Sequence, residues 1–282
     1  MIDLHLHTTA SDGRLPSAAL VARAADAGLT ILGVTDHDTT AGLREAHLAA
    51  QSLGLRIVNG IEISAVERGR DVHVLGYFID PASESLEAFL QQQRTQRLAR
   101  VTAIGNRLRD LGCDVDVPGI IASLSRQAGK TIGRPQIADA LVARGHAADR
   151  RDAFDRLLGE GRPAYVPRAG VPLAAAVAAI RGAGGIASLA HPGLLGMDDE
   201  IERFATEGLS AIEARHTDHD PLTEARYRAM AARLGLAVSG GSDFHGDDSH
   251  HPSGLGVVTL SPDDFARLES LARTADGAIS PR

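Results

Sequence analysis

The sequence has little of several residue types, and each shortage excludes a class of protein. Cys113 is the only cysteine, which excludes an intrachain disulfide framework and a thiolate-rich metal site and suits a reducing cytoplasm. Tryptophan is absent and aromatic residues make up 3% of the chain, so few side chains could stack on nucleic acid bases. No signal peptide is visible, and no apolar run approaches the roughly 20 residues of a membrane-spanning helix. We therefore predict a cytoplasmic protein that has no membrane anchor.

The charge balance is acidic, with 29 Lys and Arg residues against 36 Asp and Glu residues and a formal net charge of -7. This balance disfavours sequence-independent binding to duplex DNA or to anionic membranes, although the chain can still carry a local cationic site. Its 282 residues suffice for one large domain with an insertion or for two modest domains. Neither length nor composition indicates an oligomeric state.

Short apolar runs alternate with stretches of helical periodicity in two parts of the chain, residues 1–82 and 168–282. Strands separated by helices of this length are typical of parallel βα units, and ligands after the C-terminal ends of such strands are typical of βα barrels. The predicted strands are 2–6, 31–34, 56–63, 72–78, 185–190, 209–214, 236–239 and a short last strand at 255–260, and the intervening helices are 16–28, 41–53, 171–182, 221–234 and 262–273.

Between residues 83 and 167 the strand pattern disappears, and segments 91–111, 137–143 and 151–158 have helical periodicity. We interpret this part as a helical subdomain inserted into the barrel formed by 1–82 and 168–282, contributing to the substrate site. It is richer in arginine than its flanks, and most of its arginines are predicted to lie on solvated helix faces. The arginines in question are Arg94, Arg97, Arg100, Arg107 and Arg109.

The first predicted strand carries Asp-x-His-x-His at residues 3–7, and its alternation places both imidazoles on one face. A single His-x-His pair fits the polar face of an edge strand as well as it fits a metal site. Here, however, histidines and carboxylates recur after apolar runs along the whole chain. The candidate ligands are His5, His7, Asp12, His37, Glu62, His73, His191, Asp243 and His245.

Neutral imidazole and carboxylate are ligands for Mn, Fe or Zn, whereas this much nitrogen disfavours Mg. Nine such residues exceed what one ion needs, so we expect two or three divalent ions. Such a centre catalyses ester hydrolysis by lowering the pKa of bound water and by neutralising anionic oxygens.

The complete set of motifs resembles that of the polymerase and histidinol phosphatase (PHP) family. The motifs are Asp-x-His-x-His (3–7), Ser-Asp-Gly (11–13), Thr-Asp-His-Asp (35–38), Gly-x-Glu-x-Ser (60–64), His-x-x-Gly (73–76), Ala-His-Pro-Gly (190–193) and Gly-Ser-Asp-Phe-His (241–245). Within the family, the chain is most similar to bacterial phosphoesterases that act on nucleoside 3′,5′-bisphosphates and short 5′-phosphorylated RNA. It resembles histidinol phosphatases less, because of its Ser-Asp-Gly motif and its helical insertion.

The resemblance implies a distorted (βα)7 TIM-like barrel and a role for each candidate ligand. One ion would be held by His5, His7, Glu62 and Asp243, with Glu62 bridging to a second ion. The resemblance assigns His73 and His191 to that second ion, and Asp12, His37 and His245 to a third. Manganese is the expected metal, with iron and zinc as alternatives, and Glu62, Asp243 and His191 are the expected catalytic residues.

The implied activity is that of a phosphoric ester hydrolase in which a metal-bridging hydroxide attacks phosphorus. Its substrate would be a small nucleotide, such as adenosine 3′,5′-bisphosphate, or a short 5′-phosphorylated RNA. Two alternatives are a histidinol-phosphate phosphatase and a non-catalytic metal-binding module, and the complete ligand set argues against the second.

Further residues are candidates for supporting roles. Arg134 and Arg162 lie in Gly-Arg-Pro turns at the edges of the insertion and could bind a second phosphate through charge-assisted hydrogen bonds, and His219 could contact phosphate as well. Asp36 and Asp38 are predicted to orient imidazoles, with capping of the following helix as the alternative. Three other histidines are as compatible with plain loop positions as with a role in the site, namely His216, His250 and His251.

Overall fold

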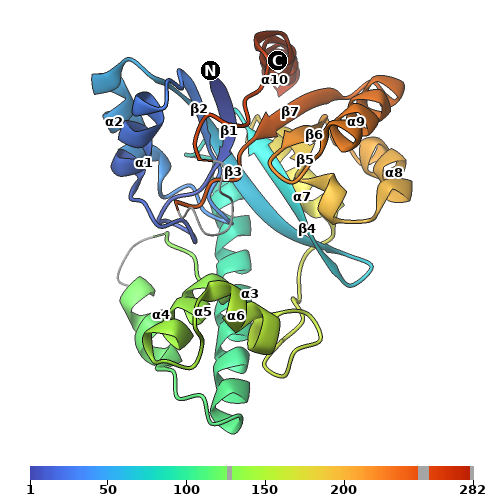
Figure 1. Cartoon of the computed structure of the whole chain (residues 1–282). Helices are drawn as coiled ribbons and strands as arrows, with labels where there is room; N and C mark the ends of the chain where they lie inside the picture. Colours follow the sequence, from blue (N-terminus) through green and yellow to red (C-terminus); the bar gives the residue numbers. More distant parts are fainter. Residues whose placement is uncertain (126–128, 247–253, 280–282) are drawn as a thin grey trace.

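Residues 1–125, 129–246 and 254–279 are described by the computed structural model (Figure 1). Seven strands form one sheet in which every strand lies next to its neighbour in the sequence. They are β1 (Ile2–Leu6), β2 (Ile31–Val34), β3 (Arg56–Glu67), β4 (Arg70–Tyr77), β5 (Ile186–Leu189), β6 (Ala211–His216) and β7 (Ala237–Gly241).

The sheet curls into a nearly closed barrel because the chain after β7 returns to β1. The backbone N–H of His7 donates to the carbonyl of Phe244 at 3.0 Å, and the N–H of Ser242 donates to Oδ1 of Asp3 at 3.0 Å. Gly241 allows the close approach, since a Cβ there would lie 2.4 Å from the backbone nitrogen of His5. The predicted seven-stranded barrel is thus confirmed.

The strand directions differ from the prediction of parallel units at β4, which runs antiparallel to both β3 and β5. β3 and β4 are joined by Arg68 and Gly69, which have φ values of 49° and 78°. Two residues in this left-handed conformation make a tight hairpin, whereas a parallel crossover needs a dozen or more residues. All the other pairs in the sheet are parallel.

The hairpin also changes where two of the predicted ligands lie. Glu62 is in the middle of a 12-residue strand rather than at its end, and His73 is near the start of β4. Because the two strands are antiparallel, His73 pairs with Ser64 and still faces the end of the barrel that collects the other ligands. The expected strand at 255–260 is also wrong, since Leu260 makes only an isolated bridge to Ile2.

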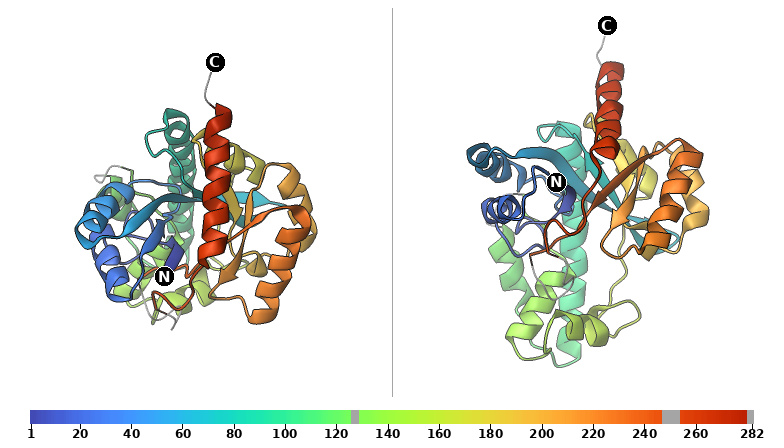
Figure 2. Two further views of the ribbon diagram at one scale, coloured as in Figure 1. Left: turned by 90° about the horizontal axis from the view of Figure 1, so that it is seen from above. Right: turned by 45° about the horizontal axis from the view of Figure 1, so that its top comes forward.

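Helices pack around the outside of the barrel and bury its apolar side chains in two clusters. α1 illustrates why, since Leu20, Val21 and Ala24 share one buried face of the helix. α8 was not predicted, and α10 runs further than Arg273 and projects beyond the rest of the barrel (Figure 2). The helices are α1 (Ser17–Asp26), α2 (Leu43–Leu53), α7 (Leu173–Gly182), α8 (Ile201–Thr206), α9 (Pro221–Leu234) and α10 (Pro262–Ile279). In the described part of the chain, no helix has the length and apolar character needed to cross a membrane.

The remaining helices form a separate body below the barrel in Figure 1, and α3 connects the two. Leu86 and Leu90 at the start of α3 belong to the barrel core, whereas Ile104 and Leu108 belong to a second core made with the other inserted helices. The inserted helices are α3 (Glu84–Asp110), α4 (Val117–Ser125), α5 (Arg134–Ala143) and α6 (Arg150–Ala153), which continues as a π-helical turn at Phe154–Leu158. The exact division at residues 83 and 167 stays a prediction.

Candidate metal centre

Glu62 lies at the centre of the predicted site and is 1% exposed. One of its oxygens, Oε2, is 3.3 Å from Nε2 of His5, 3.2 Å from Nε2 of His7 and 3.2 Å from Nδ1 of His37. Burial alone would raise the pKa of the Glu62 carboxyl, but the surrounding imidazoles hold it well below its usual range. Glu62 is therefore an ionised carboxylate inside a shell of ring nitrogens.

The second oxygen of Glu62 faces a different pair of histidines. Oε1 is 2.9 Å from Nδ1 of His73 and 3.3 Å from Nε2 of His191. The two oxygens of one carboxylate thus point to two sets of imidazoles, which is the arrangement that a carboxylate bridging two ions requires.

Asp243 follows β7 and completes the first set. Its Oδ1 is 3.2 Å from Nε2 of His5 and 3.1 Å from Nε2 of His7, and its backbone has a φ of 54°. Since a positive φ is uncommon for a residue other than glycine, this backbone is held in place by its surroundings. His5, His7, Glu62 and Asp243 present ligand atoms that all lie within 4.8 Å of one another.

Asp12 collects the last predicted set from the loop after β1. Its Oδ1 is 3.3 Å from Nε2 of His245, and its Oδ2 is 3.7 Å from Nε2 of His37. His7 joins this set through Nδ1, which is 3.7 Å from Oδ1 of Asp12. The structure therefore brings all nine predicted ligands together, with His7 placed between two of the groups.

The predicted second set is less compact than the other two. The ligand atoms of Glu62, His73 and His37 lie within 4.8 Å of one another, but His191 is not part of this group. Its Nε2 contacts Oε1 of Glu62, the same oxygen that His73 contacts. The assignment of individual ions to individual residues therefore remains a prediction.

The donor set fits divalent metal ions. Both ring nitrogens of His7 and the Nδ1 atoms of His37 and His191 are buried and have no hydrogen-bond partner among the residues that the structure describes. Burial lowers the pKa of His37 to about 3, so this imidazole is neutral at physiological pH, as a metal ligand must be. Burial also opposes protonation of His7, but Asp243 and Glu62 outweigh it and raise the pKa of His7 to about 10. A cation is thus favoured between these side chains, and a divalent ion would replace the His7 proton.

Two acidic residues predicted to orient imidazoles make other contacts. Asp36 accepts hydrogen bonds from the backbone and hydroxyl of Thr8 at 2.8 and 2.7 Å and from the hydroxyl of Ser11 at 2.6 Å, so it holds the loop that carries Asp12. Asp38 accepts from the backbone of Ser64. Neither residue caps α2, whose N-cap is Gly42, so the capping alternative is wrong. Among the described residues, neither carboxylate makes a hydrogen bond to an imidazole, so the orienting role stays a prediction.

The carboxylate that does support an imidazole, Glu213 on β6, was missed, whereas the sequence leaves His216 on the same strand open between a plain loop position and a role in the site. Glu213 is fully buried and receives a hydrogen bond from Nδ1 of His5 at 2.9 Å. His216 is 3% exposed, and its Nε2 lies 3.7 Å from Oδ2 of Asp243. A glutamate within the apolar run Ala-Ile-Glu-Ala was the available signal, since an ionisable residue inside a strand needs a buried partner.

A cavity of about 210 Å³ adjoins the centre and has four arginines in its lining. It is bordered by Asp12, His37 and His73 on the barrel side. Asp71 of β4 belongs to the same side, and the other side is bordered by Arg97, Arg100, Arg134 and Arg168.

The prediction that most of the α3 arginines are solvated is wrong for Arg94, Arg97 and Arg100, and the last two reach this cavity. Arg97 is 11% exposed and donates from Nε to Oδ2 of Asp38 at 2.5 Å, and Arg100 is 9% exposed and donates to the carbonyl of Val166. They lie on the inner face of α3 where the helix passes the barrel, which the predicted helix at 91–111 did not reveal. Arg168, which immediately follows the predicted insertion, was missed.

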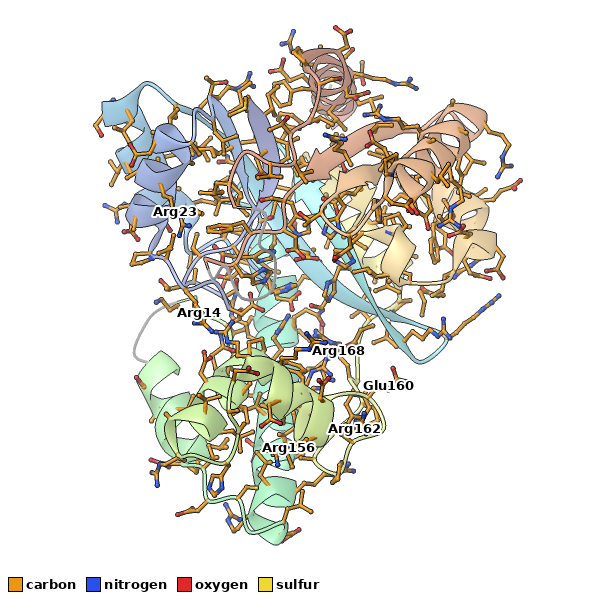
Figure 3. All side chains as sticks on the ribbon, in the orientation of Figure 1. Arg14, Arg23, Arg156, Glu160, Arg162 and Arg168 are labelled. Atoms are coloured by element: carbon orange, nitrogen blue, oxygen red, sulfur yellow. The ribbon has the colours of Figure 1, made fainter. Side chains whose placement is uncertain are left out.

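Of the three predicted substrate-binding residues, one lies in this cavity. Arg134 lines it, 3.4 Å from Asp71. Arg162 is exposed in the loop of the insertion and does not line the cavity, and Figure 3 shows it farther from the barrel than Arg168.

His219 has both ring nitrogens engaged, Nδ1 by the carbonyl of Ala214 at 2.9 Å and Nε2 by the backbone N–H of Gly193 at 3.1 Å. It therefore braces the turn that follows His191. His250 and His251 lie outside the described residues.

Comparison with known proteins agrees with the fold and the site. The PHP domain family matches residues 3–118. A 3′,5′-nucleoside bisphosphate phosphatase of Chromobacterium violaceum is 38% identical over 251 residues, which are 86% of this chain and 87% of the relative. A 5′-3′ exoribonuclease of Haemophilus influenzae is 34% identical over 251 residues, which are 86% and 89% of the two chains.

A solved structure from Bifidobacterium adolescentis, described as a candidate metal-dependent phosphoesterase, is 34% identical and superposes with a TM-score of 0.87 over 95% of both chains. The barrel, the nine gathered ligands and these similarities define a metal-dependent phosphoric ester hydrolase. The chain belongs to the PHP family.

Proposed function

We propose that this chain hydrolyses a phosphate ester of a nucleotide that carries a second phosphate. The substrate would be a nucleoside 3′,5′-bisphosphate or a short 5′-phosphorylated RNA. The observation that carries the proposal is the arginine-lined cavity, because it lies directly beside the predicted ligands and is far more basic than the chain as a whole.

The charges of the cavity favour a second anionic group. The four guanidinium groups have two carboxylates as ion-pair partners, Asp38 and Asp71. Burial first, and then the neighbouring Arg97, lower the pKa of Arg168 to about 10, so both burial and the crowding of positive charge disfavour its charged form. A phosphate would relieve the crowding and could accept bidentate hydrogen bonds from the guanidinium groups.

The nine predicted ligands would hold two or three ions, and we propose manganese as the metal. When bound, such ions lower the pKa of a water ligand and neutralise the phosphate oxygens. The two oxygens of Glu62 would fix the distance between the imidazoles that face each of them. Asp12 lies on the Nδ1 side of His7, away from the Nε2 atom that faces Glu62, and His245 contacts Asp12 and stacks on the ring of His7. The arginines would orient the substrate by its other phosphate, so that the scissile ester faces the centre.

Histidinol phosphate suits this cavity less well, since it has one phosphate and carries a cationic amine that four arginines would repel. A module without catalytic activity has no need for an arginine-lined cavity beside its metal ligands. We also propose a cytoplasmic location and a substrate site shared between the barrel and the insertion.

The proposal is tested by measuring phosphate and nucleotide release with Mn²⁺ added. The substrates are adenosine 3′,5′-bisphosphate, a 5′-phosphorylated trinucleotide RNA, the same RNA without its 5′-phosphate, histidinol phosphate and an aryl phosphate. We expect the first two to have the highest kcat/KM. A preference for histidinol phosphate, or equal rates on RNA with and without the 5′-phosphate together with no activity on the bisphosphate, would contradict the proposal.

A further inference from the structure

Strand β6 contributes none of the nine predicted ligands, yet it places two ionisable side chains beneath them. Glu213 is fully buried and His216 is 3% exposed. A buried carboxylate is costly unless each of its oxygens is satisfied. The partners of Glu213 therefore show what keeps it there.

The two oxygens of Glu213 are used by two residues assigned to different ions. Oε1 is 2.9 Å from Nδ1 of His5, and Oε2 accepts the backbone N–H of His191 at 2.8 Å. The first contact has a chemical consequence, because a carboxylate can only accept. Nδ1 of His5 must then carry the proton, which leaves the lone pair of Nε2 facing Glu62 and Asp243.

The second contact holds an unusual backbone. His191 has φ 28° and ψ 55°, at the edge of a conformation that residues other than glycine adopt uncommonly. This backbone directs the imidazole of His191 so that Nε2 lies 3.3 Å from Oε1 of Glu62. The hydrogen bond from the His191 N–H to Glu213 holds the backbone of His191 two residues after the end of β5.

Glu213, His5 and His216 have ligand atoms close enough together to suggest a metal site of their own. The hydrogen bonds argue otherwise. Both oxygens of Glu213 already face N–H donors, and Nδ1 of His216 accepts the backbone N–H of Asp218 at 3.1 Å. These contacts make the group a support beneath the centre rather than a fourth set of ligands.

We propose that Glu213 is a positioning residue that couples two predicted ion sites, setting the tautomer of His5 with one oxygen and the backbone of His191 with the other. The inference rests on the metal centre of the proposed function and is independent of the substrate. Loss of a residue that hydrogen-bonds to a metal ligand typically weakens metal binding about 10- to 100-fold.

The informative substitution is Glu213→Gln, which keeps the shape and leaves one acceptor instead of two. The amide oxygen must stay with the His191 N–H, which can only donate. The amide NH₂ then faces Nδ1 of His5 and forces the imidazole proton to Nε2, where it competes with the metal.

Glu67→Gln is a matched control, because Glu67, on β3, is like Glu213 a buried strand glutamate that accepts a backbone N–H. Its donor is Leu173 at 2.8 Å, and it lies outside the centre. Mn²⁺ affinity and stoichiometry are measured by calorimetry, and thermal unfolding is followed in chelator. We expect Glu213→Gln to bind Mn²⁺ about 10- to 100-fold more weakly than wild type, and Glu67→Gln to bind like wild type. Affinity within twofold of wild type in folded Glu213→Gln would overturn the inference.

A second measurement needs no change at Glu213 and therefore holds even if the variant does not fold. Long-range ¹H–¹⁵N correlation spectra of the Zn²⁺-loaded wild-type protein report the tautomer of each imidazole, and His5 is assigned by comparison with His5→Gln. The inference expects the proton on Nδ1 and would be overturned by a proton on Nε2. If wild type binds metal and hydrolyses no phosphate ester, the proposed function fails while both measurements on Glu213 keep their meaning.

Discussion

The cavity beside the metal centre has two walls that differ in origin and in charge. The barrel supplies a wall of imidazoles and carboxylates from strands and the loops after them, whereas α3, α5 and the chain after the insertion supply a wall of arginines. In the first wall the carboxylate oxygens lie 2.9–3.7 Å from ring nitrogens that a cation can join. In the second wall the cations outnumber their carboxylate partners. In the proposed function, the barrel wall supplies the chemistry and the arginine wall supplies the choice of substrate.

The two walls are nevertheless not independent. The carboxylates that neutralise part of the arginine wall, Asp38 and Asp71, belong to the barrel and lie next to His37 or two residues from His73. Asp38 also accepts the backbone N–H of Ser64 on β3. A movement of the insertion would therefore be transmitted through these ion pairs to the backbone that carries His37 and His73.

The largest effect is expected in the metal wall, from Glu62→Gln. The change keeps the shape of the side chain and removes the charge around which five imidazoles gather. We expect turnover to fall to background, with Mn²⁺ stoichiometry reduced and the circular dichroism spectrum unchanged. Near-normal kcat in this variant would show that Glu62 does not bridge the ions.

The next effect is expected at the connection between the walls, from Asp38→Asn. Burial would raise the pKa of Asp38, but Arg97 and Arg168 outweigh it and hold the pKa below the ordinary 3.8. Removing one partner of such a buried pair costs about 3–5 kcal/mol in the free energy of unfolding at neutral pH.

The cost should depend on pH in a defined direction. Because the pKa of Asp38 is lower in the folded chain, the stabilisation is complete above pH 3.8 and is lost as the pH falls through the folded-state value. Urea unfolding at pH 7 and in steps below pH 4 measures the difference between wild type and Asp38→Asn. A difference that stays constant over this range, or grows in acid, would contradict the ion-pair explanation.

The smallest effect is expected in the arginine wall, from Arg134→Ala and Arg168→Ala. Each should lower kcat/KM for adenosine 3′,5′-bisphosphate about tenfold to a hundredfold, since a charge-assisted hydrogen bond contributes about 1.5–3 kcal/mol. An aryl phosphate without a second phosphate should be affected less than threefold.

Arg162→Ala is the internal control for this comparison, because Arg162 is exposed and does not line the cavity. A loss on the bisphosphate equal to that of Arg134→Ala would restore Arg162 to the role that its Gly-Arg-Pro turn predicted. Equal losses on both substrates in Arg134→Ala or Arg168→Ala would mean that the arginine wall supports the fold and not a second phosphate.

Much of the metal wall could be predicted from the sequence. Each of its ligands occurs in a short motif tied to a strand, and a barrel necessarily gathers the ends of its strands at one rim. The order of the strands and the existence of a helical insertion followed from periodicity in the same way. The antiparallel β4 was predictable in part, because the segment between the two predicted strands, residues 64–71, is shorter than the dozen or more residues that a parallel crossover needs.

Apart from Arg134, which its Gly-Arg-Pro turn singles out, the members of the arginine wall and the partners of Glu213 could be found only in the tertiary structure. Arg97 meets Asp38 across 59 positions of sequence, and His5 meets Glu213 across 208. Periodicity indicates which face of a helix or strand is apolar. It does not indicate which charged group of the barrel an inserted helix will contact. The predicted metal ligands of this protein can therefore be identified from local sequence motifs. Its arginine-lined cavity arises only when an inserted helix packs against the barrel, because this packing brings together residues that no local pattern relates.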